Sequence, residues 1–211
     1  MKIATFNINN VKKRLPNLLD WLKASKPDIA CLQELKCTDE DFPGVALARV
    51  GYKAVWKGQK FWNGVAILSR RGAPVLTATT RLERRARELI RSGAPVILCG
   101  DLNVAPTPLD VYSTTSWDDD ALVHPKSRAA YARLLKQGWT DALRESHPDE
   151  RIYTFWHYMR RRWERDAGLR LDHLLISPAI AEQLAEAAVD RRVRALENAS
   201  DHAPVWVQLA R

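Results

Sequence analysis

Short apolar runs alternate with helical patterns along this chain, and that alternation constrains the fold more than any other feature. Residues 3–7 and 29–32 are apolar runs of strand length. Between them, residues 14–25 carry leucines at the spacing of one helix face. Because interleaved strands and helices pack as layers, the order predicts a layered α/β domain. Further strands are expected over 52–56, 65–69, 96–99, 171–176 and 205–209, and further helices over 82–90, 128–137 and 178–188.

Four short stretches place polar side chains at the expected ends of strands. Asn, Asp and Gly are ordinary turn residues, so one such stretch is weak evidence for a site. Four strand ends over one pocket would instead gather carboxylates, amides and a histidine. That set suits a hard divalent metal and the hydrolysis of a phosphate ester. The stretches are Phe6-Asn7-Ile8-Asn9, Gln33-Glu34-Leu35-Lys36, Gly100-Asp101-Leu102-Asn103 and Ser200-Asp201-His202.

Length and composition indicate one globular domain. The chain has 211 residues, 46% of them hydrophobic and 27% charged, so residues 1–211 are expected to share one core. No apolar run approaches the roughly 20 residues of a membrane span, and the N-terminal run lacks the features of a signal peptide. The three cysteines lack CxxC spacing, which argues against a disulfide framework and a zinc site. We therefore expect a reducing compartment, most simply a bacterial cytoplasm.

Basic side chains outnumber acidic ones. Lys and Arg total 33 against 25 Asp and Glu, a net charge of +8. Such an excess favours binding to nucleic acid, although a basic surface can also serve solubility alone. The carboxylates expected in the site leave the rest of the surface more basic than the total indicates.

Taken in chain order, several motifs resemble the exonuclease III family of abasic-site endonucleases, within the wider endonuclease/exonuclease/phosphatase superfamily. The resemblance covers almost the whole chain. It implies a four-layer αββα sandwich of two mixed β-sheets flanked by helices. The motifs are Phe6-Asn7-Ile8-Asn9, Cys31-Leu32-Gln33-Glu34-Leu35-Lys36-Cys37, Gly51-Tyr52, Asn63-Gly64-Val65-Ala66-Ile67-Leu68-Ser69, the stretch 100–108, Thr154-Phe155-Trp156, Gly168-Leu169-Arg170-Leu171-Asp172 and the stretch 200–205.

The same resemblance implies a DNA repair nuclease that depends on Mg²⁺, with Mn²⁺ able to substitute. Its implied substrate is double-stranded DNA, cut 5′ to abasic sites and trimmed at 3′ ends. A monomer is expected, with no membrane association and a cytoplasmic location at the nucleoid when DNA is bound.

The chain departs from the family in its central region. After residues 69–75 the family has several tens more residues, which form central strands and carry a Tyr-x-Pro-Asn-Gly-like motif. Here residues 76–80 run almost directly into the arginine-rich helix, and no Tyr-x-Pro-Asn occurs. Two explanations stay open: a variant that has lost the segment, or a sequence from which it is missing. A smaller departure is His157, where the family commonly has an acidic or small polar residue; we interpret it as a surface change.

The resemblance implies a catalytic group of four residues. Asp101 would be the general base that activates water, and Asn103 would orient water and stabilise the oxyanion. His202 would bond the scissile phosphate oxygen, with Asp172 orienting the imidazole. Asp101 and Asn103 stand two apart, so an extended backbone would project them the same way. A lone Asp–His pair is more often structural, and the matched neighbours favour catalysis here.

The resemblance also implies a metal site with phosphate contacts beside it. Glu34 would bind the metal, with Asp201 or Asn7 nearby. Asn9 and Lys36 would contact phosphate. Taken alone, Glu34 would more often be a salt-bridged strand-end residue, and Asn7 and Asn9 would be turn residues.

A third group is implied to line a pocket for an extrahelical abasic sugar. An abasic nucleotide flips easily because it has no base to unstack. Plain core packing is the alternative, above all for Phe155 and Leu171, because buried aromatic and aliphatic side chains are usually core. The implied pocket residues are Phe155, Trp156, Leu169 and Leu171.

Three groups of arginines are the least specific signal, since a charge run is usually a solvated face. We favour the middle group for backbone phosphates because it adjoins the expected pocket, with Arg160 and Arg161 as the contacts. The groups are Arg81, Arg84, Arg85, Arg87 and Arg91; Arg160, Arg161, Arg162 and Arg165; and Arg191, Arg192 and Arg194.

Two rival functions stay open. The first is a DNA-binding relative whose catalysis weakened when the central phosphate-contacting segment was lost. The second is another phosphoesterase of the superfamily, such as a lipid or inositol phosphatase, against which the basic charge and residues 154–172 argue.

Overall fold

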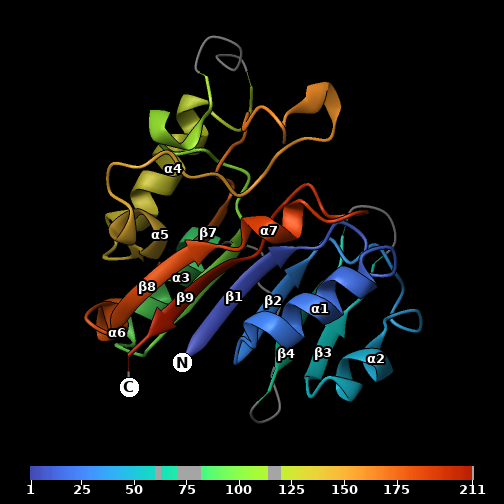
Figure 1. Ribbon diagram of the computed structural model, residues 1–211. Helices are drawn as coiled ribbons and strands as arrows, with labels where there is room; N and C mark the ends of the chain where they lie inside the picture. Colours follow the sequence, from blue (N-terminus) through green and yellow to red (C-terminus); the bar gives the residue numbers. More distant parts are fainter. Residues whose placement is uncertain (60–62, 71–81, 114–119, 211) are drawn as a thin grey trace.

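The elements follow the expected order with few exceptions (Figure 1). The computed structural model describes residues 1–59, 63–70, 82–113 and 120–210; the segment 76–80 and Arg81 lie outside these ranges. No helix within the described ranges is long and apolar enough to cross a membrane. The strands are β1 (Lys2–Asn7), β2 (Ile29–Gln33), β3 (Lys53–Lys57), β4 (Val65–Ser69), β5 (Ile97–Asp101), β6 (Thr140–Asp141), β7 (Asp172–Ile176), β8 (Leu184–Val189) and β9 (Val205–Leu209). The helices are α1 (Leu15–Ser25), α2 (Gly44–Arg49), α3 (Leu82–Arg91), α4 (Pro125–Leu135), α5 (Ala142–Ser146), α6 (Pro178–Ala181) and α7 (Arg191–Arg194), with short 3₁₀ turns η1 (Pro108–Asp110) and η2 (Met159–Arg161).

The strands form two mixed or antiparallel sheets. The larger has six strands in the order β3-β4-β2-β1-β9-β8, and the smaller, within the described residues, has the order β5-β7-β6. β1 and β2 are parallel, whereas β9 runs antiparallel to β1. The start of β1 and the end of β9 lie side by side, and the N-terminal amine donates to the carbonyl of Leu209 at 2.7 Å.

Alternation along the strands sorts the side chains into four layers. On β1, Phe6 faces α1 and packs edge-on against Trp21, with ring centroids 5.8 Å apart. Ile3 points the other way and joins Leu174 of β7 in the core between the sheets. Leu175 faces outward from the smaller sheet, toward α3 and α4. The layers are therefore helix, sheet, sheet and helix, which confirms the expected αββα sandwich.

Among the described residues, the smaller sheet covers only part of the larger one. β5 lies at the edge of the smaller sheet in the described residues. A cavity of about 620 Å³ opens beside it, lined by apolar side chains that include Ile29, Ile67 and Ile97. A sandwich with one reduced sheet is the form expected of a chain shortened in its central region.

One expected helix is wrong. Helix α6 ends at Ala181, a turn follows, and residues 184–188 of the expected range 178–188 belong to β8. Alanine and glutamate are good helix formers, which is why the sequence favours a helix there. β8 instead pairs with β9 along the edge of the larger sheet and buries Ala187 between the sheets. Ladder pairing and burial outweigh intrinsic propensity at such a position.

Candidate active site

The polar residues expected to form a site meet at one end of the two sheets. Asn7 and Asp101 end β1 and β5, and Asp172 begins β7. Because β5 and β7 are antiparallel with Asp101 directly opposite Asp172, the two carboxylates share one face. Leu174, two residues further along β7, packs between the sheets, so this is the inner face. Strand pairing alone therefore places two acidic side chains side by side in the interior.

A hydrogen-bonded Asp–His pair is the most buried part of the site. His202 Nδ1 lies 2.7 Å from Asp172 Oδ2, and both residues are buried. Burial alone lowers the pKa of His202, but the charge and hydrogen bond of Asp172, with the charge of Asp101, raise it to about 10. His202 is therefore an imidazolium at neutral pH, with Nε2 3.7 Å from Asp101 Oδ2.

Asp101 has the properties of a general base. Burial, and then the charge of Asp172, raise the pKa of Asp101 to about 6, against the opposing effect of His202. The Asn103 N–H donates to Asp101 Oδ1 at 2.9 Å, and Asn7 Nδ2 donates to Oδ2 at 3.1 Å. A carboxylate of this pKa is ionised at neutral pH and still takes up a proton more readily than an ordinary aspartate.

Asn7 joins the base to the expected metal ligand. Its Nδ2 donates to Glu34 Oε1 at 3.0 Å and to Asp101 Oδ2 at 3.1 Å. Its oxygen accepts the N–H of Asn9 at 3.1 Å. In this arrangement the Asn7 amide group donates to both carboxylates. Its oxygen faces the backbone of the loop after β1, whose N–H can only donate.

The expected phosphate contacts lie beside the expected metal residues. Lys36 Nζ is 3.0 Å from Glu34 Oε2 and donates to Asn9 Oδ1 at 2.6 Å. Asn9 Nδ2 in turn donates to Asp201 Oδ1 at 2.8 Å. A continuous polar chain thus runs from Glu34 to Asp201, and four side chains from distant parts of the sequence are brought together.

The backbone of these loops is strained. Glu34 and Lys36 have φ values of 53° and 50°, and Asn9 and Asn103 have 44° and 50°. The left-handed region is tolerated by asparagine but is uncommon for glutamate and lysine, and such residues concentrate at functional sites. Buried Leu35 lies between the two, and its N–H donates to the Gly64 carbonyl at 3.2 Å. Packing and this bond hold the loop in its strained form.

The carboxylates of the site suit a metal ion that is bound by the protein and the substrate together. Within the described part of the chain, no group of three or more His, Cys, Asp or Glu side chains is arranged to hold a metal. Mg²⁺ commonly keeps several waters and is bound by one or two carboxylates together with substrate phosphates. The Glu34 side chain is 29% exposed, so its carboxylate can meet an ion from the solvent side. Asp201 is half-buried and ends the same polar chain.

The four expected pocket residues divide into one lining residue, two that pack beneath it and one that is buried elsewhere. Phe155 lines a cavity of about 460 Å³ and lies 4.9 Å from the ring of His202. Leu169 pairs with Phe155 across a β-bridge, and with Leu171 it forms a buried cluster beneath the ring. Trp156 is fully buried elsewhere, against Tyr153. Trp156 as a lining residue is therefore a correction: neighbours on an extended backbone point to opposite sides.

Polar and charged side chains line the Phe155 cavity together with Leu122 and Met159. They are Asp120, His157, Arg160 and Arg162. His157, expected to be a surface change, is exposed and borders the cavity. Arg160 and Arg161 are exposed, with left-handed φ values of 57° and 51°.

Five arginines of the other two groups pair within the protein itself. Within the described part of α3, Arg84, Arg85 and Arg87 pair with glutamates of the same helix. Arg191 pairs with Asp166 at 2.7 Å, and buried Arg194 donates to the Trp156 carbonyl. The middle group is thus the one beside the cavity.

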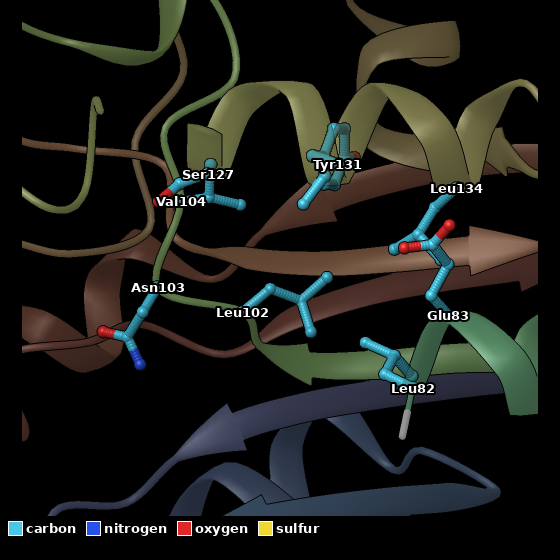
Figure 2. Close-up of a pocket in the computed structure, with 9 residues that line it drawn as sticks. Leu82, Glu83, Leu102, Asn103, Val104, Ser127, Tyr131 and Leu134 are labelled. Carbon is cyan, nitrogen blue, oxygen red and sulfur yellow. The ribbon is translucent and has the colours of Figure 1, made fainter. Parts of the chain in front are cut away.

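Asn103 stands at the border between the site and a second cavity (Figure 2). This cavity of about 300 Å³ lies between α3, α4 and the loop after β5, and Leu82, Leu102 and Tyr131 make its lining mostly apolar. Figure 2 shows the Asn103 side chain at one end and Leu134 with Glu83 at the other. The acidic residues of the site lie outside this cavity.

Sequence reasoning missed two supports of the site. Thr154 Oγ1 accepts the N–H groups of Leu171 and Asp172 at 3.0 and 3.1 Å and so fixes the start of β7. The Tyr158 hydroxyl accepts from Arg14 at 2.8 Å and donates to the Ala199 carbonyl at 3.0 Å, beside Asp201. Thr154 belongs to one of the family motifs, whereas nothing in the sequence pattern singles out Tyr158.

The family model described as "Endonuclease/Exonuclease/phosphatase family" matches residues 4–202, and the chain belongs to this family. Among solved structures, the chain is 33% identical to a 3′ phosphatase from Neisseria bound to a product DNA hairpin, with a TM-score of 0.92 and full coverage of both chains. It is 32% identical to an AP endonuclease from Archaeoglobus fulgidus, with a TM-score of 0.87 and 99% coverage of both chains. It is 28% identical to exodeoxyribonuclease III of Haemophilus influenzae over 99% of each chain.

These matches confirm the family resemblance and the expectation of a nuclease-type, metal-dependent hydrolase. The alignment with the Haemophilus protein spans 265 positions, whereas this chain has 211 residues, so at least 54 positions of that alignment have no counterpart here. A shortened chain that still matches over its whole length is what an absent internal segment produces.

Proposed function

We propose that this protein is a magnesium-dependent hydrolase of DNA phosphoesters that cuts 5′ to abasic sites and trims 3′ ends. The observation that carries the proposal is the placement of Asp101 against the Asp172–His202 pair, with Glu34 linked to the same carboxylate through Asn7. The base and the buried imidazole face each other, with Asp101 Oδ2 3.7 Å from His202 Nε2.

In the proposed reaction, Asp101 takes the proton from a water that attacks phosphorus. His202 donates Nε2–H to a phosphoryl oxygen whose negative charge grows in the transition state. Asp172 holds the imidazolium by its Nδ1–H, and Asn7 keeps the base and Glu34 at a set separation. Glu34, with Asp201 beside it, would hold Mg²⁺ together with phosphate oxygens and waters. When bound, the ion supplies positive charge that stabilises the phosphorane-like transition state and the leaving oxygen.

The proposed substrate is duplex DNA with a terminus or a missing base. The net charge of +8 and the exposed Arg160 and Arg161 favour a polyanion. The cavity beside Phe155 has an apolar cluster beneath the ring and two arginines, Arg160 and Arg162, in its lining, which suits a deoxyribose that carries a phosphate. The relatives described as a 3′ phosphatase and an AP endonuclease support both reactions.

The test compares three duplexes of one sequence: intact, with a single abasic site, and nicked with a 3′-phosphate. Each is incubated with the protein in magnesium and in chelator, with Asp101→Asn as the matched inactive control. Magnesium-dependent cleavage of the abasic duplex and release of phosphate from the nicked one are expected. Binding of all three without turnover would identify a DNA-binding relative that has lost catalysis, and turnover that persists in chelator would refute the role of the metal.

A further inference from the structure

A buried charge network outside the reacting groups connects three separate elements next to the site. The Arg170 side chain is only 1% exposed, and its partner Asp110 is fully buried. The Nε of Arg170 lies 2.6 Å from Asp110 Oδ1, and its Nη1 lies 2.7 Å from Asp141 Oδ2. The network therefore ties the start of β7 to η1 and to β6.

The charges of this network balance, which makes its burial tolerable. Arg144 Nη2 lies 2.6 Å from the same Asp110 oxygen, so two arginines face two carboxylates. Burial acts to raise the pKa of Asp110, but the charge of Arg170 outweighs it and brings the pKa to about 2. An uncompensated buried charge would be strongly destabilising, so each member depends on the others.

Arg170 stands in the middle of the segment that builds the site. Leu169 and Leu171 on either side form the floor beneath Phe155. Asp172 follows and holds His202. The Arg170 N–H also donates to the Asp110 carbonyl at 2.9 Å, so backbone and side chain fix the same contact.

The same segment is tied to the strand end that carries the base. The N–H of Leu102 donates to the carbonyl of Leu171 at 3.0 Å. The side chain of His173, next to Arg170 at 3.2 Å, lies 2.9 Å from the Val104 carbonyl. Movement of the Arg170 segment would therefore displace Asp172 and the loop that follows Asp101 together.

We propose that Arg170 is a positioning residue for catalysis. Its guanidinium group binds Asp110 and Asp141 at the same time and thereby holds Asp172 in place relative to Asp101 and His202. The inference rests on the proposed function. Lysine would retain the charge but cannot bridge both carboxylates in a fixed plane, because its ammonium is a single flexible point charge. Misplacement of a catalytic group by about 1 Å can cost about 10²-fold in rate.

The experiment compares Arg170→Lys with Arg144→Lys. Both variants replace an arginine on Asp110, but Arg144 lies on α5 and is otherwise bound to the carbonyls of His147 and Glu150. We expect both to lower the melting temperature. Only Arg170→Lys should lower turnover, by about 10²-fold with the KM for DNA little changed. It should also shift the NMR signal of the His202 Nδ1 proton, which reports the bond to Asp172 without any need for activity.

Several outcomes would overturn the proposal. Full turnover in Arg170→Lys, an equal loss in Arg144→Lys, or an unchanged His202 proton signal would each show that the network only stabilises the fold. Should Arg170→Lys fail to fold, Asp141→Asn removes one arm while keeping the Arg170–Asp110 pair, and unchanged turnover and His202 signal there would overturn it equally. If the wild-type protein does not cleave DNA, that result counts against the proposed function. The NMR comparison of the variants still tests the role of Arg170, because it does not depend on activity.

Discussion

Replacing Asp172 with asparagine should change both the rate of cleavage and its dependence on pH. Asp172 is fully buried, and its Oδ2 is 2.7 Å from His202 Nδ1. Its charge raises the pKa of His202 to about 10 against the effect of burial, and it helps burial to raise the pKa of Asp101 to about 6. Asparagine has nearly the same size but no charge, so the packing is kept while both pKa values fall.

The expected loss can be bounded from these values. Without Asp172 the pKa of His202 falls, because the largest raising influence is lost while burial still lowers it. An imidazole of ordinary pKa, about 6.5, is protonated in roughly one molecule in ten at about pH 7.5, which sets the scale of the expected loss in kcat/KM at about tenfold. Loss of orientation adds to this, up to the roughly 10⁴-fold cost of the same change in a Ser-His-Asp triad.

The assay is kcat/KM on the abasic duplex from about pH 5 to about pH 10. The wild-type rate should rise with pH as Asp101 ionises, through about pH 6, and fall as His202 loses its proton, near pH 10. In Asp172→Asn both limbs should move to lower pH. Asp20→Asn, at a helix carboxylate 76% exposed, is the control and should leave the profile unchanged. A profile for Asp172→Asn that is only scaled down, with its limbs in place, would refute the reasoning.

Three further predictions address the other roles. Asp101→Asn should lower cleavage by about 10²–10⁴-fold while DNA binding in chelator, followed by gel shift, stays near wild type; near-normal cleavage would exclude Asp101 as the base. Glu34→Gln should raise the magnesium concentration needed for half-maximal rate and leave the melting temperature without metal almost unchanged, whereas a large loss of apo stability would mark Glu34 as structural. Changing Arg160 and Arg161 together to alanine should reduce the slope of log affinity against log salt by about 0.9 for each phosphate that the variant no longer neutralises, and an unchanged slope would place the DNA face elsewhere.

The strands around the site could be predicted from the sequence because each follows from a local pattern. Alternation of apolar and polar side chains marks which residues of a strand face inward. Asn7 and Asp101 end apolar runs, so both were expected at a strand end, and the structure places them there. The helix predicted over 178–188 was wrong because alanine and glutamate favour a helix, whereas β9, the strand that pairs with β8, lies some 20 residues further along the chain.

The sequence by itself determined the layered α/β class, the strand ends at which chemistry would gather, and the family resemblance. The tertiary structure decided how those ends combine. It set Asp101 opposite Asp172, turned the Asn7 amide donors toward Glu34, and buried Trp156 away from the cavity. The first depends on the pairing register of β5 and β7, the second on the approach of the loop after β2, and the third on which side of the segment meets the core. These are contacts between residues distant in sequence, and a local pattern does not carry them.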